Sequence, residues 1–130
     1  MANPNIVNVS TITGANAGWN LSGTLTASLL TVATGYVVKI NSITVANIDP
    51  STAYSVNLYI DTLATTGATG VTLTGADATV YIAKTISVPA NATLTLLSAP
   101  IYLMEGNILK GGGSTTDKLD LIVSYEIMTS

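Results

Sequence analysis

The segment Leu119-Asp120-Leu121-Ile122-Val123-Ser124-Tyr125-Glu126-Ile127 alternates along its whole length. Its odd-numbered positions are all apolar or aromatic, and its even-numbered positions are polar except at Ile122. A period of two is typical of a β-strand that has one covered face. Residues 54–61 repeat the pattern, with apolar or aromatic side chains at every even-numbered position. Alternation of this kind predicts antiparallel sheets, each packed on a core by one face.

The rest of the chain has the composition of strands and turns. Strong helix formers such as Glu, Gln, Lys and Arg are nearly absent, and no stretch shows a period of 3.6 residues. Roughly eight or nine short strands are expected between Gly, Pro and Asp turn signals. They fall at residues 6–12, 24–32, 38–45, 54–61, 80–88, 93–97, 101–103, 107–110 and 119–127, with a weaker candidate at 70–74. The sequence therefore predicts one all-β domain over residues 1–130, an antiparallel β-sandwich, with an extended N-terminal arm at residues 1–9.

Two of the expected strands break their own alternation. In residues 38–45 the apolar phase slips around Asn41-Ser42, which a β-bulge or a strand that changes sheets would explain. In residues 80–88 the apolar set comprises Val80, Ile82, Ile86 and Val88, but Lys84 shares their phase. That strand is expected to be bulged or to lie near a sheet edge.

The composition excludes many kinds of chemistry. The chain has four Lys and no Arg, His or Cys, and its charged fraction is 8%. These absences exclude the usual zinc sites, Cys or Ser–His nucleophiles, haem ligation and disulfides. A net charge of −3 argues against a nucleic-acid partner, and no apolar run is long enough to span a membrane. We therefore expect no enzyme activity, no cofactor, no nucleic acid and no membrane association.

Two motifs invite a chemical interpretation that their context does not favour. Lys110-Gly111-Gly112-Gly113-Ser114 has the wrong order for a phosphate-binding loop, so a hairpin loop is expected, flexible over residues 111–117. The seven carboxylates are spread along the chain and are expected on solvated faces and in turns. A calcium site that combines Asp side chains with backbone carbonyls stays open as an alternative, although no spacing supports it.

Few residues stand out as contact candidates. Trp19 lies in the glycine-rich residues 14–23, expected as a loop, and Tyr59 lies on the polar phase of its strand. In the N-terminal arm, Asn5, Ile6 and Val7 could dock on a neighbour. A surface with so little charge also favours self-association, and we expect a homo-oligomer, with three subunits as the first choice.

Several blocks resemble a known class of protein. The blocks are residues 1–9, residues 38–43 with Ala46-Asn47, residues 83–90, and residues 101–107 with residues 123–126. Together they are similar to small virion-associated proteins of marine tailed phages, cyanophages among them. Residues 101–107 also resemble the late strand-turn-strand of many jelly rolls, in which Leu-x-x-Gly-Asp begins the penultimate strand, except that Asn107 replaces the Asp.

The resemblance implies a non-enzymatic structural protein of a phage particle, located in the virion. A head decoration or cement protein is expected first, with the major capsid protein, or tail and neck components, as partners. A tail, fibre or baseplate domain is the alternative, in which Trp19, Tyr59 and residues 62–79 would recognise a host glycan. A bacterial surface-layer or pilus-like subunit is a third alternative.

Overall fold

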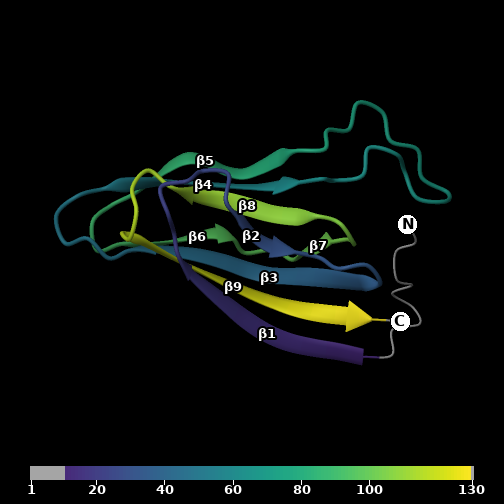
Figure 1. Ribbon diagram of the computed structural model, residues 1–130, viewed down its shortest axis with the longest axis horizontal. Helices are drawn as coiled ribbons and strands as arrows, with labels where there is room; N and C mark the ends of the chain where they lie inside the picture. Colours follow the sequence, from purple (N-terminus) through teal and green to yellow (C-terminus); the bar gives the residue numbers. More distant parts are fainter. Residues whose placement is uncertain (1–10, 130) are drawn as a thin grey trace.

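The computed structural model describes residues 11–129. These residues form two antiparallel sheets packed face to face, which confirms the predicted all-β sandwich (Figure 1). The strands are β1 (Thr11–Asn20), β2 (Ser28–Thr31), β3 (Tyr36–Asn47), β4 (Tyr54–Asp61), β5 (Val80–Val88), β6 (Thr93–Leu97), β7 (Ile101–Leu103), β8 (Ile108–Gly113) and β9 (Leu119–Thr129).

The strand order is that of a jelly roll. The first sheet runs β1-β9-β3-β6, with β7 also paired to β3, and the second sheet runs β2-β8-β4-β5. Strands β6 and β7 pair with different parts of β3, so together they act as one interrupted edge strand. Consecutive strands otherwise cross between the sheets, except for the β4–β5 connection within the second sheet. This connectivity is the double Greek key that defines a jelly roll.

The core lies between the two sheets. The alternation predicted for β9 is confirmed, because Leu119, Leu121 and Val123 are buried while Asp120 and Ile122 are exposed. Side chains from both sheets fill the interior. The largest fully buried ones include Leu21, Ile40, Ile43, Leu58, Leu103, Leu109, Leu119 and Leu121. Burying one such side chain stabilises the fold by roughly 1.5–3 kcal/mol.

Both predicted phase breaks are present. In β3 the pairing with β9 shifts register between Ile40 and Ser42, so the slip is a bulge and the strand stays in one sheet. β5 is both bulged and an edge strand, and Thr85 within it has a left-handed φ of 51°. Val80 and Ile86 lie opposite the buried residues Ile60 and Val56, yet both are exposed, because β5 is an edge strand with no neighbour on its open side among the described strands.

Two glycine-rich segments differ from the prediction. Residues 14–20 are not a loop but most of β1, which pairs with β9 over ten residues without a break. Residues 111–113 are not a flexible hairpin but the buried end of β8. Residues 62–79 form the expected long loop, and no strand forms at residues 70–74 (Figure 1). The predicted arm at residues 1–9, with Asn5, Ile6 and Val7, lies outside the described residues.

Candidate interaction surface

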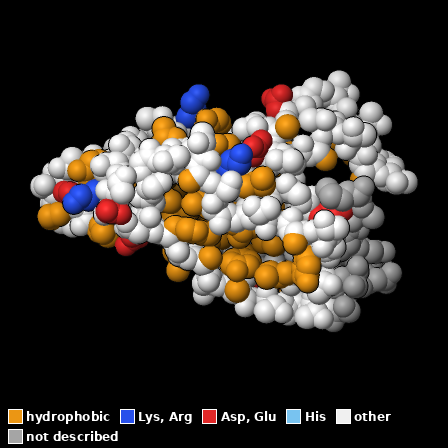
Figure 2. Space-filling model, viewed as in Figure 1, with side chains coloured by type: hydrophobic (Ala, Val, Ile, Leu, Met, Phe, Trp, Pro, Cys, Tyr) orange, Lys and Arg blue, Asp and Glu red, His pale blue; other side chains and the backbone are white. Residues whose placement is uncertain are grey.

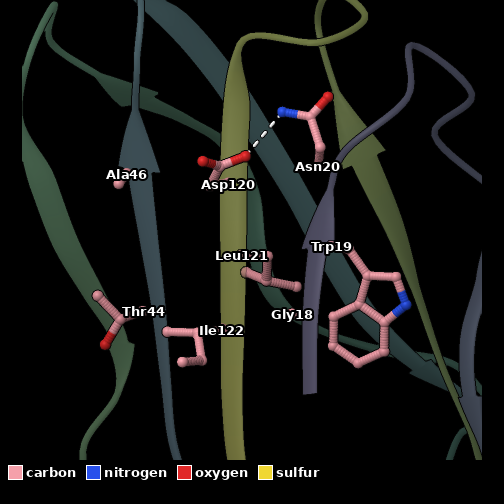
Figure 3. Close-up of a pocket in the computed structure, with 8 residues that line it drawn as sticks. All are labelled: Gly18, Trp19, Asn20, Thr44, Ala46, Asp120, Leu121 and Ile122. Atoms are coloured by element: carbon pink, nitrogen blue, oxygen red, sulfur yellow. Dashed lines mark hydrogen bonds between the residues drawn. The ribbon is translucent and has the colours of Figure 1, made fainter. Parts of the chain in front are cut away.

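A shallow hollow lies on the first sheet where β1, β9 and β3 run side by side (Figure 3). We call it the Gly18 hollow. Its volume is about 380 Å³, and it is lined by Gly18, Trp19, Asn20, Thr44, Ala46, Asp120, Leu121 and Ile122. The β-sheet register places Ile122 directly between Gly18 on β1 and Thr44 on β3. Because Gly18 has no side chain, β1 does not cover Ile122 there, and Ile122 is 51% exposed.

A polar pair closes one end of the Gly18 hollow. The Asn20 side-chain amide donates a hydrogen bond of 2.7 Å to Oδ1 of Asp120 (Figure 3). The two residues are opposite each other in the register of β1 and β9. The hollow therefore offers an apolar floor with one acidic, amide-bonded end, which suits a protein side chain or a sugar better than an anion.

Trp19 belongs to this surface, although not in the way the sequence indicated. It lies in strand β1, on the inward phase, and its half-buried ring packs against the core. It also lines the Gly18 hollow, at the edge of the sandwich. Trp19 is therefore an anchor of the edge strand as well as a contact candidate.

Tyr59 is not the exposed aromatic residue that its phase predicted. Its side chain is only 8% exposed, because the ring of Tyr81 on the neighbouring strand β5 lies 5.1 Å away, centroid to centroid. Tyr81 is 47% exposed instead, and Nζ of Lys84 lies 5.2 Å from its ring centroid. Tyr81 was not among the contact candidates predicted from the sequence, although its place on the phase opposite Val80 and Ile82 could have revealed it.

A second hollow, of about 440 Å³, lies between the start of the 62–79 loop and the β7–β8 turn. Glu105, 5% exposed, accepts a 2.7 Å hydrogen bond from the backbone N–H of Gly35 through Oε2, while its Oε1 atom is buried without a hydrogen bond. Asn107 holds the turn itself. Its Oδ1 accepts from the Met104 N–H, and its Nδ2 donates to the Thr62 carbonyl, both at 2.8 Å.

The turn has Asn107 where the jelly-roll pattern that the sequence resembles has Asp, and the two hydrogen bonds of Asn107 give a reason. The position must both accept and donate, and a carboxylate cannot donate. We expect Asn107→Asp to lower the free energy of unfolding by about 1–3 kcal/mol, because a buried carboxylate oxygen would face the Thr62 carbonyl. Urea denaturation at pH 7 measures this. Asn57→Asp is the control with the same chemical change, because the Asn57 side chain accepts a bond from the Thr85 N–H and aspartate keeps that acceptor. Equal losses in both variants would contradict the turn's requirement for an amide.

The charged side chains pair with neighbouring groups of the same chain. Lys110 Nζ lies 2.7 Å from Oδ2 of Asp61, so the lysine of the glycine-rich motif pairs with a carboxylate instead of facing a phosphate. Asp61 also accepts from the Thr79 hydroxyl and the Thr62 N–H, each at 2.8 Å. The Lys110 bond first, and then these two, lower the pKa of Asp61 from 3.8 to about 2. Hydrogen bonds led by the Ser51 N–H likewise lower the pKa of Asp49.

These shifts predict how stability depends on pH. Since the pKa of Asp61 is lower in the folded chain than the unfolded value of 3.8, its contribution is complete above about pH 4 and is lost as the pH falls towards 2. We expect the thermal midpoint to drop over this interval. In Asp61→Asn the midpoint should be lower at pH 7 and the drop smaller. Asp77→Asn, in the loop that follows β4, should keep the wild-type drop, and an unchanged drop in Asp61→Asn would contradict the assignment.

Within residues 11–129 no three acidic side chains lie close enough together to share a metal ion. The same residues contain no helix long and apolar enough to cross a membrane. No protein-family model and no curated protein matches the chain.

Proposed function

We propose that this protein is a non-enzymatic structural component of a tailed-phage virion, a decoration or cement protein that stabilises the head by bridging capsid subunits. The observation that carries the proposal is a jelly roll whose surface is poor in charge and rich in exposed apolar side chains. These include Ile12, Tyr36, Ile48, Val71, Val80, Tyr81, Ile86, Tyr102 and Ile122. Such a surface favours burial against other proteins.

The distribution of charge supports an assembled role. Figure 2 shows hydrophobic side chains gathered in a band across the middle of one face, with few charged side chains scattered around it. Asp61 and Lys110, and Asp49 and Lys118, neutralise each other in pairs. A decoration protein would use the remaining apolar area and its open strand edges to contact the major capsid protein.

The test is binding to phage heads. Purified protein is mixed with unexpanded and with expanded capsids of a marine tailed phage that lack their decoration protein, and bound protein is measured by co-sedimentation. We expect saturable binding to expanded capsids and a higher temperature of capsid disruption. No binding to either form, with the protein folded, would contradict a decoration role.

A tail, fibre or baseplate domain that binds a glycan is the second proposal. It is supported by the Gly18 hollow, where an apolar floor ends at the Asn20–Asp120 pair, because that pair offers polar groups to sugar hydroxyls beside an apolar surface. Gly18 and Asn20 line this hollow, so shifts of their amide NMR signals on adding host-surface glycans would report on it. A signal unchanged up to millimolar glycan would exclude binding at the Gly18 hollow.

A further inference from the structure

Within residues 11–129 the sandwich has four open edges, and three of them carry features that hinder pairing with another chain. β6 and β7 are short and interrupted, and β2 has four residues with a register shift. β5 is bulged and carries Lys84. Natural sheets protect their edges with such devices, because an open edge pairs readily with another strand.

Edge strand β1 has none of these features. It pairs with β9 through ten residues in an unbroken register, and its sequence TITGANAGWN contains no charge and no proline. Figure 1 shows β1 as the outermost strand of its sheet, and no described strand pairs with its open side. A long, unbroken and uncharged edge is the one that another strand can extend.

The backbone of β1 is in the correct phase for this pairing. Just beyond the strand, the N–H of Leu21 donates a 2.7 Å hydrogen bond to the Leu119 carbonyl, in the same register as the pairing of β1 with β9. Because hydrogen-bonding direction alternates along a strand, odd-numbered residues of β1 bond to β9. The even-numbered residues, Ile12, Gly14, Asn16, Gly18 and Asn20, direct their N–H and carbonyl groups to the open side.

We propose that β1 pairs antiparallel with β1 of a second copy of this chain, around a two-fold axis at Ala15. Both copies must keep their inner faces on the same side of the joined sheet. Residues of equal parity must therefore lie opposite each other. With Ala15 opposite itself, Gly14 lies opposite the second copy's Asn16, and Ile12 lies opposite the second copy's Gly18.

This register is favoured because it fills the Gly18 hollow. Ile12 is 61% exposed on the outer face, and across the joint it would lie over the second copy's Gly18, next to that copy's Ile122. Cross-strand neighbours on one face lie about 5 Å apart, so two isoleucines flanking a glycine can meet above it. Shifting the axis to Asn16 would place Ile12 against Asn20, which is bonded to Asp120, and shifting it to Gly14 would place Ile12 against Asn16.

The charge of β1 and the area of the contact indicate which assembly is expected. Two copies of β1 meet without like-charge repulsion, because the strand is uncharged. One strand pair with two isoleucine contacts buries less than the roughly 1,600 Å² of a standard stable interface, so a reversible dimer is expected. A two-fold pair differs from the trimer that the composition favoured, and the mass in solution distinguishes the two.

The experiment combines mass with residue-resolved hydrogen exchange. Sedimentation equilibrium of the full chain over a wide concentration range gives the subunit number, and exchange by NMR gives amide protection at low and high concentration. We expect a dimer at high concentration, with the amides of Gly14, Asn16 and Gly18 gaining protection as it forms. Ile12→Asp should weaken the dimer at least about tenfold, since a carboxylate would enter an apolar contact.

Ile86→Asp is the matched control, because Ile86 is an exposed isoleucine on the other sheet's edge strand β5. It should dimerise like the wild type. A monomer at every concentration, a trimer, a dimer without new protection at Gly14, Asn16 and Gly18, or equal weakening by both variants would each overturn the pairing. Capsid co-sedimentation is a separate readout, so a monomer that still binds heads would overturn this pairing and leave the decoration role standing.

Discussion

Gly112→Ala is expected to lower the free energy of unfolding by about 3 kcal/mol or more, at the upper end of the range for overpacked interiors. Gly112 lies in β8, inside the second sheet between β2 and β4. A Cβ atom placed there would collide with the carbonyl oxygen of Thr24 and would lie 2.9 Å from the carbonyl oxygen of Ser22. Both obstacles are backbone atoms, so no side chain can turn away to relieve the contact.

The segment that meets Gly112 cannot easily retreat. The Gly113 N–H donates to the Ser22 carbonyl at 2.9 Å, and the Gly111 N–H donates to the Ala27 carbonyl at 3.0 Å. Moving residues 22–27 away to accommodate a methyl group would therefore lengthen the hydrogen bonds that attach them to β8. Loss of stability through both overpacking and weakened backbone bonding is the reason for the large expected effect.

Gly14→Ala is the matched control for this prediction. Gly14 also lies in a strand, but a Cβ atom there has nothing within 4 Å and its φ is not left-handed. Alanine in a strand costs less backbone entropy than glycine, so this variant should match the wild type or exceed it by about 0.5–1 kcal/mol. Denaturant unfolding of both variants gives the comparison, and similar midpoints for the two would contradict the close approach at Gly112.

The predictions that succeeded were those that depend on alternation within one strand. The phase of β9 and the slip at Asn41-Ser42 are local properties, because the pleat fixes which side chains share a face. The slip was therefore visible in the sequence, which left a bulge or a change of sheet open, and the register with β9 shows a bulge. The weaker alternation of β5 predicted an edge or a bulge, and β5 has both. It could not show that Val80 and Ile86 would be left exposed at that edge.

The predictions that failed concern glycine-rich segments whose structure depends on distant partners. Residues 14–20 resemble a loop by composition, but pairing with β9, about a hundred residues later, makes them a strand. Tertiary pairing of this kind overrides weak local propensity. The same applies to residues 111–113, where small size is needed for close backbone approach and not for flexibility.

The candidate surface was predictable only in part. Trp19 was identified from its residue type, and it does line the Gly18 hollow. The hollow itself results from the register that sets Gly18 beside Ile122, and no local pattern encodes that pairing. For Tyr59 the outward phase was predicted correctly. Its exposure was not, because Tyr81 from the next strand covers it.

Asn47→Ala is expected to lower the free energy of unfolding by about 3–5 kcal/mol, because one buried amide satisfies three backbone groups. Asn47 ends β3 and is 3% exposed. Its Nδ2 donates to the carbonyls of Thr52 and Val88, each at 2.9 Å, and its Oδ1 accepts from the Asp49 N–H at 2.9 Å. These bonds join the first sheet to the β3–β4 loop and to the end of β5.

Asn47→Asp separates the donor from the acceptor function. The aspartate keeps an acceptor for the Asp49 N–H but sets a carboxylate oxygen against two carbonyls, so at pH 7 it should destabilise at least as much as alanine. Asn20→Ala, which removes a single exposed bond to Asp120, should cost less than about 1 kcal/mol. Guanidinium unfolding of the three variants should therefore rank Asn47→Asp and Asn47→Ala far below Asn20→Ala. A loss at Asn47 as small as at Asn20 would mean that the loop and β5 are held to β3 by packing alone.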